Sequence, residues 1–306
     1  MAISYQQMTC PDGATLNYVD VGSGRPLIYL QGFGETIANA YGALEAWSGQ
    51  FRSLCFDFRG WGDSTPTDNV GVYQTARDLR LFLERFDLQD VTLVGYSMGG
   101  SVAFAYLSEF GCDRIGQLVL ADTSPKLINE GEYKVGLWQG RYTFKDLEQD
   151  LQLIHDHLNL FHMSFYVRST LPSLPEETLC YPERGDYDAW FAIACEITGL
   201  RPALIRRVFN ADESPERVRI ETRYWREMLE QDKRDVLPNI AVPTLCVYAE
   251  PGSFYSPRTA QFCASQIPNA KVEIVPNATH VFPKERFSQY VEIIRNFALR
   301  DGQIDN

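Results

Sequence analysis

A serine between two glycines is the first feature of this sequence that could do covalent chemistry. Gly95, Ser97 and Gly99 form the pattern Gly-x-Ser-x-Gly, which follows the apolar run 91–94 and precedes a helix-like stretch at 101–110. Such a turn from a strand into a helix crowds the backbone, and small neighbours let the hydroxyl project above the edge of the sheet. The pattern therefore predicts that Ser97 is a nucleophile for acyl groups, on a nucleophile elbow.

A serine hydroxyl needs a base, and one histidine is well placed to serve. Three of the four histidines fall between residues 125 and 235. His280 instead follows the apolar run 272–275 and precedes a helical pattern at 285–299, at the sheet edge expected for Ser97. An imidazole there can take the serine proton and pass it to a leaving group. We predict that His280 is the base, the alternative being a histidine that packs or caps in a turn.

The other three histidines, His155, His157 and His162, raise the question of a metal site. On a helix, residues two apart face different sides, and the spacing from His157 to His162 misses the geometry of a helical ligand pair. We expect hydrogen-bonded or solvated side chains there. We also expect no metal and no organic cofactor, because a serine and a histidine can carry out acyl transfer without either.

Six short apolar runs bounded by turn signals predict strands that are buried on both faces. These strands must position Ser97 and His280. Helical patterns lie between several of them, notably at 73–86 and 285–299. This alternation predicts an α/β fold with a mostly parallel sheet flanked by helices. The six runs are 26–30, 54–57, 91–94, 117–121, 244–248 and 272–275.

The alternation breaks once, where a long segment separates two strands that elsewhere are joined by one helix or loop. We expect residues 125–235 to form an inserted helical cap, and residues 1–124 and 236–306 to form the core. Helical patterns within the cap lie at 144–158, 187–197 and 215–229.

Composition and charge exclude several classes of partner. The chain has 306 residues, 45% of them hydrophobic, enough for a large core, and its formal charge of -12 repels nucleic acids and anionic lipid surfaces. The longest uncharged stretch, 91–108, carries glycines and serines in its middle, so we expect a buried strand and helix there and no membrane anchor. The first residues lack a secretory pattern, so we expect a cytoplasmic protein whose partner is a small-molecule substrate.

The seven cysteines are widely spread, which predicts free and mostly buried thiols.

Three motifs, at 95–100, 57–64 and 277–280, together resemble the α/β-hydrolase superfamily in order and spacing. The resemblance covers nearly the whole chain outside the cap, and it implies a capped enzyme of that fold with a serine nucleophile. It also implies a structural role for 57–64, which is similar to the family's loop after its fourth strand. Dehalogenases and epoxide hydrolases of this superfamily carry aspartate where this chain has Ser97, so the serine argues against those two activities.

The resemblance supplies candidates for an oxyanion hole. Residues 31–34 are similar to the family's loop after the third strand, which usually reads His-Gly, but Gln31 replaces that histidine. The glycines that follow keep the backbone geometry, so the resemblance implies that the main-chain amides of Phe33 and Met98 hold the oxyanion. Gln31 is expected either to stabilise the turn or to face a group of the substrate.

The acid that orients His280 does not stand where the family most often has it. After the strand at 244–248 the chain reads Ala-Glu-Pro-Gly-Ser, with Glu250 and no aspartate. Some members use a carboxylate at the end of the preceding strand of the sheet, and Asp122 occupies that place. We favour Asp122 and keep Glu250 as the alternative acid, although Asp122 would also suit a simple turn. A dyad oriented by Ser253 or by a carbonyl is a third arrangement.

These features predict a serine hydrolase that cleaves an ester, lactone, thioester or related acyl bond of a small to medium apolar substrate through an acyl-enzyme. The cap would enclose that substrate above the sheet. Two other kinds of enzyme on the same fold stay open: a cofactor-free dioxygenase of heteroaromatic rings, and a hydrolase of carbon–carbon bonds in β-diketones. The non-enzymatic alternative is a receptor for a small molecule.

Overall fold

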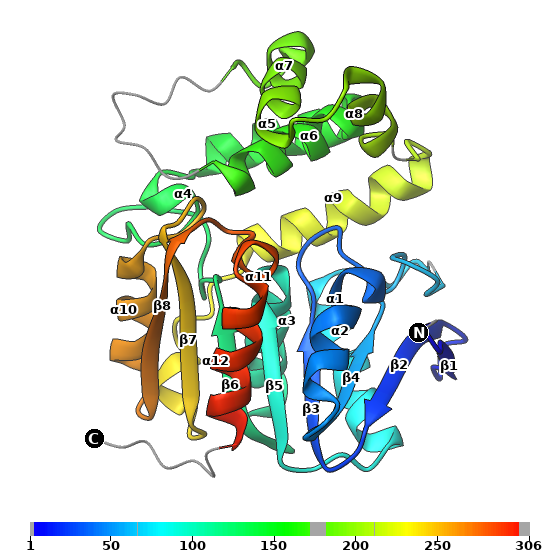
Figure 1. The fold of residues 1–306 in the computed structure, drawn as a ribbon, viewed down its shortest axis with the longest axis vertical. Coiled ribbons are helices and arrows are strands. Elements are labelled where there is room, and N and C mark those ends of the chain that lie inside the picture. The colour runs from blue at the N-terminus through cyan, green and yellow to red at the C-terminus, as the bar shows by residue number, and fades with distance from the viewer. Residues whose placement is uncertain (1–2, 66, 172–181, 211, 300–306) are drawn as a thin grey trace.

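One sheet forms the centre of the molecule. The computed structural model describes residues 3–65, 67–171, 182–210 and 212–299. Within these residues the strands are β1 (Gln6–Thr9), β2 (Thr15–Gly22), β3 (Arg25–Leu30), β4 (Phe51–Phe56), β5 (Val91–Tyr96), β6 (Ile115–Ala121), β7 (Thr244–Pro251) and β8 (Ala270–Ala278). They lie in the order β1-β2-β4-β3-β5-β6-β7-β8 (Figure 1). β2 pairs antiparallel with β1 and β4 and all other pairs are parallel, which confirms the mostly parallel sheet predicted from the sequence.

Helices cover both faces of this sheet. On one face, α1 (Ile37–Trp47) and α12 (Phe287–Leu299) share a buried apolar cluster with the strands. On the other face, α2 (Val72–Arg85), α3 (Met98–Phe110) and α10 (Pro257–Gln266) pack into a second cluster. Neighbouring side chains of β5 alternate between the two clusters, with Leu93 in the second and Val94 in the first. Burial on both faces explains why the central strands read as unbroken apolar runs in the sequence.

The chain between β6 and β7 forms a helical insertion above the sheet in Figure 1. The predicted helix at 144–158 is confirmed over Phe144–Asp156. The first helix there ends at Asp156 and the next begins at Leu158, because His157 between them has φ -152° and ψ 68°, which a helix does not accommodate. The helices of the insertion are α4 (Leu137–Gly140), α5 (Phe144–Asp156), α6 (Leu158–Thr170), α7 (Tyr187–Thr198), α8 (Pro202–Val208) and α9 (Pro215–Glu230).

The two ends of this insertion lie side by side. Lys126 and Asp232 form an isolated antiparallel bridge, and the amide of Lys233 donates to the carbonyl of Pro125 at 2.9 Å. The ammonium of Lys126 also pairs with the carboxylate of Asp232 at 3.1 Å. The insertion therefore leaves the sheet and returns to it at one place.

Two expectations drawn from composition concern the thiols and the long uncharged stretch. The six described cysteines are free and four of them are buried, and burial raises the pKa of the Cys263 thiol to about 12. Cys180 lies outside the described residues. The stretch 91–108 forms β5 and most of α3, as expected. Among the helices that the structure describes, none combines the length and the apolar character needed to span a membrane.

Candidate active site

Ser97 lies on the turn between β5 and α3. Its φ of 52° and ψ of -119° are rare for a residue with a side chain, so the surrounding packing must hold the turn. The glycines are needed because their neighbours are close. A Cβ on Gly99 would lie 2.0 Å from the carbonyl oxygen of Leu30, and a Cβ on Gly95 would lie 2.8 Å from the carbonyl oxygen of Gly99. The pattern thus builds a tight turn from which Ser97 reaches a cavity.

His280 follows β8 and lies against Ser97. Its Nε2 is 2.9 Å from the Oγ of Ser97. The ring stacks on Tyr96, with 5.3 Å between the centroids, and contacts Phe254 at 4.5 Å. The backbone of His280 is fixed as well, because its amide donates to the Oγ of Ser253 and its carbonyl accepts from the hydroxyl of Tyr96. Two rings and two main-chain hydrogen bonds therefore hold the imidazole in one orientation.

Asp122 follows β6 and completes a row of three side chains. Its Oδ2 lies 2.6 Å from the Nδ1 of His280, and the carboxylate is fully buried. Burial raises the pKa of Asp122, and the hydrogen bond from His280 opposes that rise. A carboxylate at Nδ1 keeps a proton on that nitrogen, which leaves Nε2 as an acceptor facing the hydroxyl of Ser97.

Glu250, the alternative acid, lies apart from this row. It is exposed near the end of β7, whereas the imidazole of His280 is buried. Ser253 accepts the amide of His280 and donates to the carbonyl of Ser169, so it binds main-chain groups and not the ring. Of the two carboxylates considered, the structure brings Asp122 to the imidazole.

The amides of Phe33 and Met98 are the candidates for an oxyanion hole. Met98 is the first residue of α3, so its N–H has no partner within the helix. The N–H of Phe33, in the loop after β3, donates to no other group in the described part of the chain. This loop packs close to the serine turn, since a Cβ on Gly32 would lie 3.1 Å from the ring of Tyr96. Met98 directly follows Ser97, Phe33 lines the same cavity as Ser97, and within the described ranges neither amide donates to another group.

Gln31 is turned into the sheet, away from the cavity. Its fully buried side chain donates from Nε2 to the carbonyl of Phe56 at 3.1 Å and accepts the thiol of Cys55 at Oε1 at 3.2 Å. Both partners belong to β4, so of the two roles that the sequence left open the structure supports the one that stabilises the loop. The motif at 57–64 also makes a structural contact, in which the carboxylate of Asp57 accepts the amide of Ile37 at 2.7 Å.

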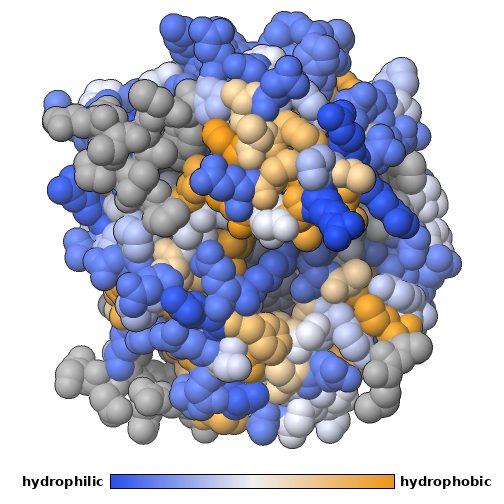
Figure 2. All heavy atoms as spheres, turned by 45° about the horizontal axis from the view of Figure 1, so that its top comes forward, coloured by the Kyte–Doolittle hydropathy of each residue, from blue (hydrophilic) through white to orange (hydrophobic). Residues whose placement is uncertain are grey.

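A cavity of about 980 Å³ opens over Ser97 and His280, between the core and the insertion. Figure 2 shows the face that carries the insertion, where apolar side chains gather beside a hollow. Mostly apolar and aromatic walls of this kind suit a small organic molecule. The apolar lining includes Phe33, Trp61, Phe165, Ile197, Val208 and Phe209.

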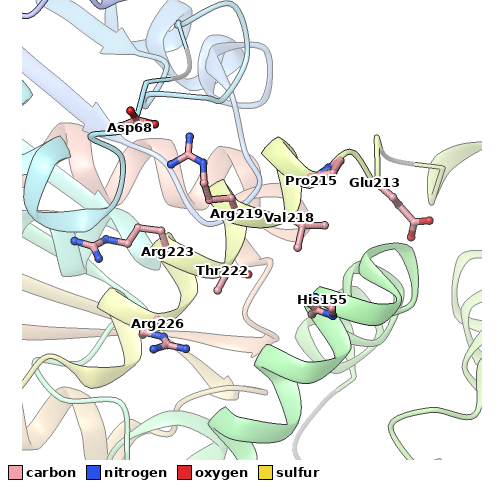
Figure 3. A pocket seen from close by; sticks show the side chains of 9 residues that line it. All are labelled: Asp68, His155, Glu213, Pro215, Val218, Arg219, Thr222, Arg223 and Arg226. Carbon is pink, nitrogen blue, oxygen red and sulfur yellow. The ribbon is translucent and has the colours of Figure 1, made fainter.

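A second cavity, of about 700 Å³, lies along α9 and contains none of the predicted catalytic residues. Figure 3 shows Arg219, Arg223 and Arg226 spaced along α9, with His155 on the neighbouring α5. Arg217, two residues before the first of these arginines, lines the large cavity instead. The helix α9 therefore contributes basic side chains to both cavities.

The three histidines of the insertion do not gather. The exposed His155 has its Nδ1 2.8 Å from Asp156, and His157 joins α5 to α6. His162 lines the large cavity, and its Nε2 lies 2.5 Å from the Oε2 of Glu221. In the ranges that the structure describes, no three His, Cys, Asp or Glu side chains form a cluster suited to a metal ion. Sequence reasoning missed the pair of His162 and Glu221, which are 59 residues apart and meet only in the fold.

Comparison with known proteins defines the class. The family described as alpha/beta hydrolase fold matches residues 25–287, and the chain belongs to it. It is an enzyme of the α/β-hydrolase fold, with a helical insertion over an eight-stranded sheet.

Its relatives carry more than one activity. A putative non-heme chloroperoxidase of Synechocystis sp. is 25% identical over 288 residues, which cover 92% of this chain and 93% of that protein. Among solved structures, an esterase from Exiguobacterium antarcticum superposes with a TM-score of 0.76 at 18% identity, covering 96% of this chain and 99% of the esterase. A bromoperoxidase from Bacillus anthracis superposes with a TM-score of 0.73 at 22% identity, again covering 96% and 99%. At these identities the two solved structures support a shared fold alone.

Proposed function

We propose that this enzyme hydrolyses esters, thioesters or lactones, with Ser97 as the nucleophile, His280 as the general base and Asp122 as the acid that orients the base. One observation carries the proposal, a continuous row of hydrogen bonds. The distances are 2.9 Å from the Oγ of Ser97 to the Nε2 of His280 and 2.6 Å from its Nδ1 to Asp122. Both are hydrogen-bond distances, and the first is short enough for direct proton transfer from Ser97 to His280.

In the proposed reaction, the Nε2 of His280 accepts the hydroxyl proton while the Oγ of Ser97 bonds to the carbonyl carbon. The negative charge that develops on the carbonyl oxygen is stabilised by the amides of Phe33 and Met98. Asp122 stabilises the imidazolium, which then gives its proton to the leaving group. The same imidazole deprotonates a water molecule that hydrolyses the acyl-enzyme.

The cavity supports a small to medium acyl substrate. Its volume of about 980 Å³ and its ring of apolar side chains suit a molecule that buries most of its surface. The edge-on packing of Phe33 against Trp61 and Phe165, at centroid distances of 5.3 and 5.9 Å, gives one wall a fixed aromatic surface. Chromogenic esters of short and medium acyl chains are therefore the substrates to try first.

A fluorophosphonate probe tests the nucleophile directly. Intact-mass measurement should show one covalent adduct on the wild-type protein and none on Ser97→Ala. Ser101→Ala is the matched control, because Ser101 lies one turn further along α3 with a buried hydroxyl, and it should label like the wild type. A folded wild-type protein that takes up no probe would contradict the serine-hydrolase proposal and would favour a small-molecule receptor.

The relative named a putative non-heme chloroperoxidase favours a second candidate function. If hydrogen peroxide attacks the acyl-enzyme in place of water, the product is a peroxy acid, which oxidises bromide. Bromination of a diketone indicator in the presence of acetate, peroxide and bromide measures this activity, and it should disappear in Ser97→Ala. An oxygen electrode with quinolone substrates separates both reactions from cofactor-free oxygenation, since neither of them consumes dioxygen.

A further inference from the structure

A buried carboxylate in the insertion holds two basic side chains at the wall of the active-site cavity. Glu221 on α9 is fully buried, and its Oε1 accepts the Nε of Arg217 at 2.6 Å while its Oε2 accepts the Nε2 of His162 at 2.5 Å. Arg217 and His162 are both partly exposed and both line the cavity that contains Ser97. One acid thus fixes two basic groups, which are held in place before any substrate arrives.

Arg217 is held from three sides, yet it keeps donors unused. Its Nη1 donates to the carbonyl of Gly60 at 2.8 Å, and its guanidinium lies 4.1 Å above the ring of Trp61. Its Nη2 donates to no group in the part of the chain that the structure describes. A rigid guanidinium with a free N–H pair at a cavity wall is well suited to a carboxylate, which accepts such donors strongly.

The carboxylates that line the cavity do not use the guanidinium of Arg217. Glu35 pairs with Lys284 at 3.0 Å, and Glu285 accepts the amide and the hydroxyl of Thr279 at 2.8 Å. Glu221 accepts the Nε of Arg217 and not its Nη2, which is therefore left for an anionic ligand.

We infer that the substrate carries a carboxylate in addition to its scissile acyl bond, and that Arg217, held in place by Glu221, binds this carboxylate beside His162. The inference rests on the proposed serine-hydrolase function and narrows its substrate class to half-esters, half-thioesters or lactone acids. Ser97 and His280 enter the cavity from the sheet, whereas Arg217 and His162 enter it from α9 and α6. The carboxylate and the acyl bond therefore occupy different parts of one apolar chamber.

Two matched substrates test this inference. Mono-4-nitrophenyl adipate carries a free carboxylate, and its methyl ester has the same acyl chain without the charge. Wild-type enzyme should show a kcat/KM at least about tenfold higher for the acid, mainly through KM, because a charge-assisted hydrogen bond stabilises the bound state. Arg217→Met should bring the ratio of the two kcat/KM values close to one, and Arg217→Lys should restore part of it.

Two further variants separate a lost subsite from a damaged fold. Arg226→Met is the matched control on the same helix, since Arg226 lines the other cavity (Figure 3), and it should keep the wild-type ratio. His162→Gln keeps a donor for Glu221, which still holds Arg217, so it should change the ratio much less than Arg217→Met does. Equal kcat/KM values for the two esters with wild-type enzyme, or the same proportional loss for both in Arg217→Met, would overturn the inference.

Calorimetry on Ser97→Ala measures the subsite without turnover. The acid should bind at least about tenfold more tightly than the methyl ester, and Arg217→Met in the Ser97→Ala background should remove the difference. If the wild type hydrolyses neither ester while the acid still binds selectively, the proposed hydrolysis is wrong and the carboxylate site stands. If both esters are hydrolysed but bind equally, the carboxylate site is wrong and the hydrolase stands.

Discussion

Replacing Asp122 by asparagine removes the charge behind the proposed base while keeping the size of the side chain. The carboxylate is fully buried and its Oδ2 lies 2.6 Å from the Nδ1 of His280. In the transition state the imidazole becomes a cation, and an amide cannot stabilise that cation as a carboxylate does. We expect Asp122→Asn to fold and to take up substrate, but to turn it over slowly.

The size of the loss follows from the geometry. A contact of 2.6 Å between Nδ1 and Oδ2 puts the centres of the two charges about 4 Å apart, where the interaction is worth about 4 kcal/mol at an effective dielectric constant of about 20. Because about 1.4 kcal/mol corresponds to a factor of ten, loss of the charge lowers kcat about a thousandfold. The asparagine amide also favours the wrong imidazole tautomer, which adds up to about another factor of ten.

The assay is the hydrolysis of one 4-nitrophenyl ester by wild type, Asp122→Asn and Glu250→Gln, with circular dichroism to confirm folding. Glu250→Gln is the matched control, since Glu250 is the exposed carboxylate near the end of β7, and it should retain activity within about twofold. Burial raises the pKa of Asp122, so its charge is lost at a higher pH than for an ordinary aspartate as the solution is acidified. A loss of less than tenfold in Asp122→Asn, or a larger loss in Glu250→Gln, would refute the assignment.

Two further changes test the turn and the base of the insertion. Gly99→Ala must push its new Cβ away from the carbonyl of Leu30, so we expect it to lower the free energy of unfolding in urea by roughly 2 kcal/mol or more. Gly49→Ala is the control, since a Cβ there meets nothing within 4 Å, and it should be neutral. A stable and fully active Gly99→Ala protein would contradict the packing argument. Arg234 lowers the pKa of Asp232 to about 2, so this carboxylate stabilises the fold above about pH 4 and the effect is lost as the pH falls towards 2. Asp232→Asn should therefore cost about 1 kcal/mol or less at pH 7, because the group is partly exposed, and the difference should shrink in urea titrations at lower pH.

The central sheet can be predicted from sequence because its strands are buried on both faces. The apolar runs at 91–94 and 117–121 fall inside β5 and β6. The edge strand β1 and its neighbour β2 escape prediction, since β1 has only one buried residue in four and gives no apolar run. Helix α6 escapes it too, because the predicted helix ends at 158 whereas the structure has a second helix over Leu158–Thr170.

The residues of the candidate site also differ in whether their roles can be predicted from neighbouring residues in the sequence. Ser97 and His280 can be proposed from neighbouring residues, because the glycine pattern and the position after a strand are local signals. Asp122 cannot be separated from a turn residue until the sheet places β6 beside β5 and its carboxylate against the ring. The contact of His162 with Glu221 carries no sequence signal, although Arg217 and Glu221, four residues apart on one helix, would suggest an ion pair.

The contact between the two ends of the insertion bears on how related proteins can exchange this part of the chain. Lys126 and Asp232 bring its two ends together, so the distance between them does not depend on how much chain lies in between. A graft of a longer or shorter insertion from a related protein at these positions would leave β6 and β7 in register and the serine turn intact. The chamber above the sheet can then be rebuilt for a new ligand as an exchangeable module, while the reacting groups below it stay where they are.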